Sequence, residues 1–128
     1  MKTGLIRGVF AVAGIFDLFV GLLFLVFGGR IFDVYGITRP NHPGYIEFPA
    51  LLLLVFGVLM IHISRNPARY RSFMWYGMGL KASYAGVVFY HLLAADIPFM
   101  WVPFAVMDLV FLVLFYISWR ATVPATEG

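Results

Sequence analysis

The stretch Gly8–Gly29, GVFAVAGIFDLFVGLLFLVFGG, carries a single charged residue, Asp17. A membrane-crossing α-helix needs about 20 mostly apolar residues to span a hydrocarbon core about 30 Å thick. The apolar run continues to Phe27, well past the roughly 7–15 apolar residues of a cleaved signal peptide. We therefore expect a retained transmembrane helix over residues 8–29.

Three further apolar runs follow, at residues 48–64, 73–95 and 99–119. They are continuous and do not alternate in polarity, which favours helices over strands. The chain is 62% hydrophobic and 12% charged, whereas soluble domains average about 45–50% and about 25%. These values exclude a soluble domain, and the high hydrophobicity excludes a disordered chain. The sequence predicts an all-α integral membrane four-helix bundle that forms one domain over residues 1–128.

Positive charge is concentrated on one side of this predicted bundle. Six of the nine Lys and Arg residues lie in the N-terminus, in the connection between the second and third runs, and in the C-terminus. They are Lys2, Arg7, Arg65, Arg69, Arg71 and Arg120. Connections rich in Lys and Arg stay in the cytoplasm, so we expect both termini to be cytoplasmic. The net charge of +3 then reflects orientation in the lipid bilayer and does not indicate a nucleic-acid partner.

The longest connection, Arg30–Tyr45, lies on the opposite side. It contains Gly36, Pro40, Pro43 and Gly44. Because Gly and Pro interrupt regular helices, we expect an irregular outer loop over this whole range.

Three charged residues, Asp17, Lys81 and Asp108, lie inside the predicted spans. Each is about nine residues from the start of its run, or about 14 Å along a helix, so all three are expected near the middle of the bilayer. A charge at that depth costs about 2.5–3.5 kcal/mol, which favours a meeting of the three. The cluster is either a site that binds a proton, an ion or a polar ligand group, or an ion pair that only fixes helix register.

Asp17 shares a helical face with Gly14, Gly21 and Gly28, which repeat every seven residues. Small residues on one face let two membrane helices approach closely. This face of the first run is therefore expected to pack against another helix.

A second polar group is expected near the outer face. Glu47 precedes the second run, His91 lies near the outer end of the third, and Arg39 and His42 come from the adjoining loop. A Glu47–His91 pair is expected to form a mouth above the buried charges, with Tyr84 between the two levels. The alternative is ordinary polarity at the membrane interface.

No cofactor or metal is expected. The chain has no cysteine, which excludes disulfides, thiolate zinc sites and iron–sulfur clusters. Two histidine ligands of a haem must lie at matching depth, whereas His62 and His91 lie near opposite ends of their runs. A His42–His91 pair would depend on the irregular loop that contains His42. HExxH, GxSxG, P-loop and GxGxxG patterns are absent from the sequence, so hydrolase and nucleotide-binding functions have no supporting motif.

Four short segments are shared with a known kind of protein: GGRIF at 28–32, VFGVL at 55–59, GLK at 79–81 and MDL at 107–109. With these segments, the chain resembles small four-span bacterial membrane proteins of the broad DoxX-like kind. The resemblance implies a multi-pass protein of the bacterial inner membrane and no particular activity.

Three functions fit the sequence. The preferred one is a non-enzymatic accessory or assembly subunit that packs on a membrane protein partner or on copies of itself. The second is a lipid-phase enzyme or binder that takes a lipid, quinone or isoprenoid through Glu47, Tyr84, His91 and the buried charges. The third is a small proton- or ion-coupled transporter in which the two buried aspartates titrate around Lys81.

Overall fold

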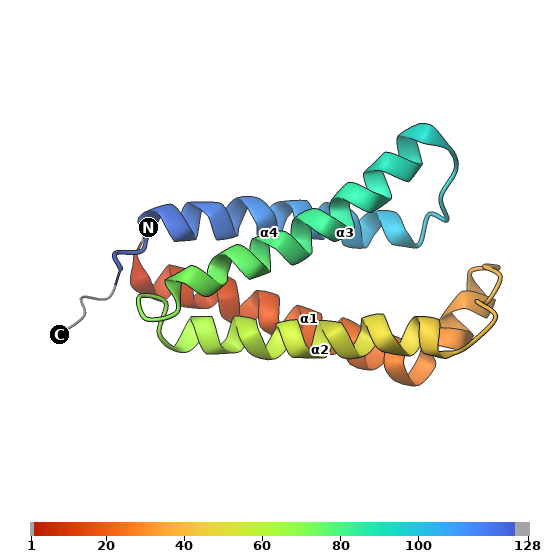
Figure 1. Ribbon diagram of the computed structural model, residues 1–128, viewed down its shortest axis with the longest axis horizontal. Helices are drawn as coiled ribbons and strands as arrows, with labels where there is room; N and C mark the ends of the chain where they lie inside the picture. Colours follow the sequence, from red (N-terminus) through yellow and green to blue (C-terminus); the bar gives the residue numbers. More distant parts are fainter. Residues whose placement is uncertain (1, 125–128) are drawn as a thin grey trace.

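The computed structural model describes residues 2–124, and that part of the chain is helical with no strand. The elements in chain order are α1 (Thr3–Val34), α2 (Gly44–Arg65), the short 3-10 helix η1 (Arg71–Phe73), α3 (Met74–Ala94) and α4 (Trp101–Ala121). The four α-helices form a bundle that is elongated along the helix axes (Figure 1).

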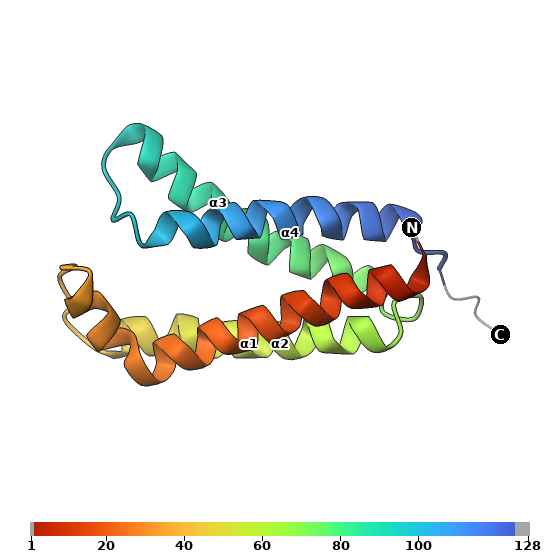
Figure 2. The same ribbon diagram turned by 180° about the vertical axis from the view of Figure 1, so that it is seen from behind.

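The bundle is built from two antiparallel hairpins. Helix α1 packs mainly on α2, and α3 packs mainly on α4. The connections at 35–43 and 95–100 lie at one end of the bundle, and the connection at 66–70 lies at the other end with the start of α1 and the end of α4 (Figure 1). The second half of α3 diverges from α4, as both views show (Figures 1 and 2).

Three of the helices, α1, α2 and α4, are long and apolar enough to cross a membrane. Helix α1 has 32 residues, or about 48 Å at 1.5 Å per residue, so it is longer than a hydrocarbon core is thick. Helix α3 has 21 residues but is less apolar, because it carries Lys81, Tyr84 and His91. By length and composition, the chain is a membrane protein.

The prediction of an irregular loop over Arg30–Tyr45 is wrong at both ends, since α1 continues to Val34 and α2 already begins at Gly44. Two residues after the end of α1, Gly36 has a φ of 68°, which lies in the left-handed region that glycine adopts without a steric penalty. The N–H of Gly36 donates to the Asp33 carbonyl at 3.1 Å, and the next N–H donates to the Phe32 carbonyl at 2.8 Å. This pair of bonds is the Schellman motif.

The glycine face of α1 packs against α2, as the seven-residue spacing predicts. A Cβ added to Gly14 would lie 2.9 Å from the Gly57 carbonyl oxygen, and one added to Gly21 would lie 2.9 Å from the Ala50 carbonyl oxygen. A Cβ on Gly28 would lie 2.5 Å from Cγ2 of Ile46. Any side chain at these positions would therefore push the two helices apart.

Two apolar clusters fill the bundle on either side of its middle. The first joins all four helices and includes Ile6, Phe10, Ala13, Met60, Ile63, Met74, Met78, Phe111 and Phe115. In it, the rings of Phe10 and Phe115 stack with centroids 4.5 Å apart, which ties α1 to α4. The second cluster includes Val20, Phe24, Phe32, Ala50 and Met100. Asp17 lies between residues of the two clusters in the sequence of α1, and Asp108 does so in α4, where Phe104 packs against the second cluster.

Candidate functional site

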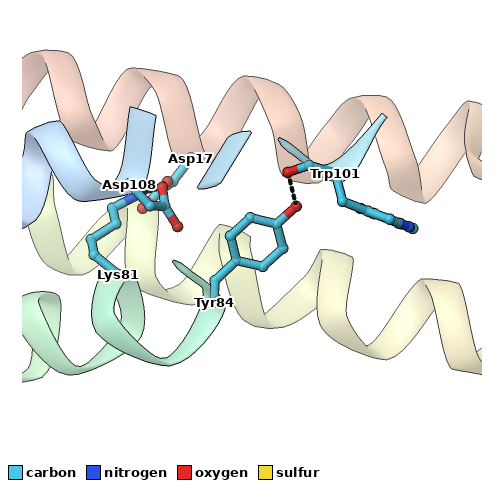
Figure 3. Close-up of polar contacts among 5 residues, drawn as sticks. All are labelled: Asp17, Lys81, Tyr84, Trp101 and Asp108. Carbon is cyan, nitrogen blue, oxygen red and sulfur yellow. Dashed lines mark hydrogen bonds and ion pairs between the residues drawn. The ribbon is translucent and has the colours of Figure 1, made fainter. Parts of the chain in front are cut away.

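Lys81 reaches from α3 to carboxylates on two other helices (Figure 3). Its Nζ lies 2.5 Å from Oδ1 of Asp17 on α1 and 3.2 Å from Oδ1 of Asp108 on α4. The exposed fractions of the side chains are 1% for Lys81, 2% for Asp17 and 10% for Asp108. The structure thus brings together the three charges that the sequence places at a common depth.

The charge cluster joins the two hairpins across the middle of the bundle. Nζ of Lys81 also lies 5.6 Å from the ring centroid of Phe16 and 5.2 Å from that of Phe111, within the range of a cation–π contact. Buried ions are costly unless they are paired and hydrogen-bonded. The two carboxylates and two aromatic faces therefore hold the Lys81 ammonium in one place.

One atom of the charge cluster is left without a partner. Oδ2 of Asp17 is buried and accepts no hydrogen bond from any of the described residues. A buried acceptor without a donor costs about 1–3 kcal/mol, and such groups are rare in folded proteins. The carboxylate of Asp17 is therefore prepared to accept one more hydrogen bond.

A cavity of about 260 Å³ lies between the two hairpins, beside the charge cluster. Its lining residues come from all four helices: Phe16, Asp17, Val20, Phe24 and Phe32 of α1; Tyr45, Ile46, Pro49, Ala50, Leu52 and Leu53 of α2; Leu80 and Tyr84 of α3; and Trp101, Phe104 and Asp108 of α4. We call this space the inter-hairpin cavity. Tyr45, Pro49 and Leu52 are exposed, so the cavity opens along the first half of α2.

Aromatic rings form much of the cavity wall. The ring of Trp101 lies with its centroid 6.1 Å from that of Phe24 and 5.7 Å from that of Phe32. The ring of Phe104 lies 6.0 Å from Phe24 and 6.5 Å from Phe16. Ligand pockets are typically apolar and aromatic with a few polar groups that fix orientation, and here the aspartates supply those groups.

Tyr84 lies between the charge cluster and Trp101, and the Trp101 ring points away from the charges (Figure 3). The Tyr84 hydroxyl donates a hydrogen bond to the Trp101 carbonyl at 3.1 Å. This bond ties α3 to the first turn of α4 beside the cavity. Tyr84 is therefore placed beside the charge cluster, and it lines the cavity.

The outer polar residues do not form the expected mouth. Glu47 and His91 are both exposed, and within residues 2–124 no hydrogen bond or ion pair joins them. His42 accepts a hydrogen bond at Nδ1 from the N–H of Gly44 at 2.9 Å. Glu47, His91 and His42 therefore do not line the inter-hairpin cavity. The mouth of the cavity lies along α2 instead.

Arg39 forms an ion pair with Asp33 at the surface. Its Nε donates to Oδ1 of Asp33 at 2.9 Å, and its Nη2 donates to Oδ2. The hydrogen bonds and the charge of Asp33 raise the pKa of the Arg39 guanidinium. This pair braces the loop against the end of α1 and is not part of the inter-hairpin cavity.

The sequence did not reveal the aromatic wall of the cavity. The chain has 14 Phe residues, and no spacing separates the rings that line a cavity, such as Phe24 and Phe104, from those that pack in a core or face lipid. In the described part of the chain, no group of three or more His, Cys, Asp and Glu residues could hold a metal ion.

The fold and the site together define an all-helical membrane protein with a charged cluster beside an inter-hairpin cavity. No protein-family model, curated protein or solved structure matches the chain.

Proposed function

We propose that the protein binds a lipophilic molecule in the inter-hairpin cavity, with the polar end of that molecule at Asp17 and Asp108. The observation that carries this proposal is the combination of an apolar, aromatic cavity with two largely buried carboxylates at its wall. An apolar body would be buried by the rings, and a polar end would be oriented by the carboxylates.

The position of the mouth supports the same function. Tyr45, Pro49 and Leu52 line the cavity and are exposed on α2, which by length and composition can cross a membrane. A molecule dissolved in the bilayer would therefore enter sideways along the first half of α2. The accessory role and the ion-coupled transport role stay predictions, and neither accounts for an aromatic cavity beside the charges.

The test is to identify what the protein carries out of its own membrane. The chain is extracted into polymer nanodiscs without detergent, and the bound small molecules are compared by mass spectrometry with those of the whole membrane. We expect one lipid, quinone or isoprenoid class to be enriched with the unmodified protein. A composition equal to that of the bulk membrane would count against the proposal.

Two variants of the same residue type make this comparison sharper. Val20 lines the cavity, so Val20→Phe should fill part of it and abolish the enrichment. Val12 lies on the same helix, is 59% exposed and does not line the cavity, so Val12→Phe should retain it. Equal enrichment in both variants would show that the molecule sits on the outer surface instead.

The proposal also places all four helices across the membrane, with both termini in the cytoplasm, as in a multi-pass protein of the bacterial inner membrane. The loops at 35–43 and 95–100 lie at one end of the bundle (Figure 1), while the Lys and Arg excess lies at the other, which supports this orientation. The DoxX-like resemblance is consistent with it and stays a prediction.

The absence of cysteine makes this orientation directly measurable. Single cysteines at Asn41, Asn66 or Asp96 are reacted with a membrane-impermeant maleimide in intact spheroplasts and after permeabilisation. We expect Asn41→Cys and Asp96→Cys to react in intact spheroplasts and Asn66→Cys only after permeabilisation. If α3 does not cross, Asp96→Cys will behave like Asn66→Cys.

A further inference from the structure

The charged side chains that line the inter-hairpin cavity are two carboxylates, which accept hydrogen bonds. Asp17 and Asp108 line the cavity, and Lys81 is not among its lining residues. The Lys81 ammonium instead lies against Oδ1 of each aspartate and near the rings of Phe16 and Phe111. A molecule in the cavity therefore meets carboxylate oxygens before it meets the ammonium.

One of these oxygens has no donor. Oδ2 of Asp17 is buried and unpartnered, while Oδ1 of the same carboxylate accepts the Lys81 hydrogen bond at 2.5 Å. A donor group on a bound molecule would satisfy Oδ2, and an acceptor group would not. Hydrogen bonds to a charged group contribute about 1.5–3 kcal/mol, so a matching head group gains more here than an unmatched one.

The net charge of the cluster of Asp17, Lys81 and Asp108 gives a second reason to expect a cationic head group. With all three groups ionised, two carboxylates and one ammonium leave one negative charge in a low-dielectric region, where an uncompensated charge is costly. A cationic head group would neutralise this charge, a neutral one would leave it, and an anionic one would add to it.

The aromatic wall of the cavity also favours a positively charged head group. Phe16, Phe24 and Phe104 line the cavity, and the rings of Phe16 and Phe104 are 6.5 Å apart by centroid. The faces of aromatic rings attract cations within about 6 Å of the centroid, with a contribution of about 0.5–2 kcal/mol. Phe16 already lies near one cation, Lys81.

We infer that the molecule bound in the inter-hairpin cavity is a lipophilic amine whose protonated nitrogen donates to Oδ2 of Asp17. The inference rests on the proposed binding function and specifies its ligand class. The nitrogen lies at the carboxylates of Asp17 and Asp108, and the apolar part extends along the aromatic wall toward the mouth on α2.

A matched ligand series on the unmodified protein tests this inference. Dodecylammonium, dodecanol and dodecanoate share one tail and differ in charge. Each is titrated by calorimetry into the protein in phosphatidylcholine nanodiscs, and the heat of partitioning into empty nanodiscs is subtracted. We expect dodecylammonium to bind about tenfold or more tightly than dodecanol, and dodecanoate to bind most weakly.

Two carboxylate-to-amide variants test whether the Asp17 carboxylate causes the preference for dodecylammonium. Asp17→Asn keeps the shape and removes the charge, so it should weaken dodecylammonium binding about tenfold and weaken binding of the uncharged dodecanol less. Asp96 is exposed and does not line the cavity, so Asp96→Asn should behave like the unmodified protein.

The failures of the two proposals give different results. If dodecanol or dodecanoate binds as tightly as dodecylammonium, or if Asp17→Asn leaves dodecylammonium binding unchanged, the amine assignment is overturned while the binding function stands. If none of the three binds the unmodified protein, and Val20→Phe gives the same heats, the binding function itself is overturned. The ligand series needs no variant, so its result stands even if Asp17→Asn does not fold.

Discussion

Nζ of Lys81 on α3 lies 2.5 Å from Oδ1 of Asp17 on α1, a contact between residues 64 positions apart in the chain. Both side chains are almost fully buried. Because α1 packs mainly on α2 and α3 mainly on α4, this ion pair is one of the few polar links between the two hairpins. Its removal should therefore affect how the hairpins associate more than how each hairpin forms.

Lys81→Met should be strongly destabilising, because it leaves the carboxylates of Asp17 and Asp108 buried without a cation. Breaking a buried ion pair from one side costs about 3–5 kcal/mol. The measurement is unfolding in mixed micelles with increasing sodium dodecyl sulfate, followed by circular dichroism. The only other lysine is the exposed Lys2, and Lys2→Met should shift the midpoint little.

The cost should largely disappear when the whole charge cluster is replaced. A triple variant with Lys81→Met, Asp17→Leu and Asp108→Leu removes every buried charge of the cluster, and apolar replacements of buried ion pairs are often neutral or stabilising. If the triple variant is as unstable as Lys81→Met alone, the loss comes from packing at residue 81 and not from unpaired charge.

Gly14→Ala should weaken the contact between α1 and α2. The added Cβ would lie 2.8 Å from Cδ1 of Ile61 and 2.9 Å from the Gly57 carbonyl oxygen, and backbone cannot move aside as a side chain can. Overpacking of this kind costs about 1–3 kcal/mol. The same unfolding assay gives the result.

Gly8→Ala is the matched control for this variant. Gly8 lies on the same helix, and nothing lies within 4 Å of its added Cβ. Alanine is a better helix former than glycine by about 1 kcal/mol, so Gly8→Ala should be neutral or stabilising. Equal destabilisation at both positions would mean that close packing does not explain the glycine at residue 14.

The charge cluster could be predicted from the sequence because two strong constraints act on it. A charged side chain in an apolar run must find a partner, and three such residues at one depth leave few alternatives. The close approach of α1 to another helix followed in the same way from Gly14, Gly21 and Gly28, although the spacing did not identify α2 as the partner. Both features depend on spacing along single helices, which a sequence records directly.

The inter-hairpin cavity could not be predicted in this way. Its wall combines residues of all four helices, and their meeting depends on how far the hairpins diverge, which no single helix encodes. The expected Glu47–His91 mouth failed for the same reason, because residues at similar depth on α2 and α3 need not face each other. The end of α1 was misplaced because the apolar run ends at Gly29, whereas the helix continues through the charged Arg30 and Asp33 to Val34.

Tyr84→Phe should loosen the link between α3 and the start of α4. It removes the hydrogen bond of the hydroxyl to the Trp101 carbonyl, which is worth about 0.5–1.5 kcal/mol, and leaves the ring in the cavity wall. Hydrogen exchange of the α4 backbone should be faster near residue 105. Tyr90 is exposed on the same helix, and Tyr90→Phe should leave exchange unchanged. Faster exchange in both variants would point to a general loss of helix stability.

Arg71→Ala should release the start of α3 from the end of α4 at the predicted cytoplasmic face. Nε of Arg71 donates to the Trp119 carbonyl at 3.1 Å, and the guanidinium lies 4.2 Å from the Trp119 ring centroid. A cation–π contact contributes about 0.5–2 kcal/mol, and the hydrogen bond adds about 1 kcal/mol, so the unfolding midpoint should fall measurably.

Arg65 is exposed at the end of α2, so Arg65→Ala removes the same charge without these contacts and should leave the midpoint unchanged. The chain has three tryptophans, so fluorescence is measured in a Trp75→Phe, Trp101→Phe background, where it reports Trp119 alone. A red shift in Arg71→Ala but not in Arg65→Ala would assign the loss to this pair, and equal shifts would assign it to the charge alone.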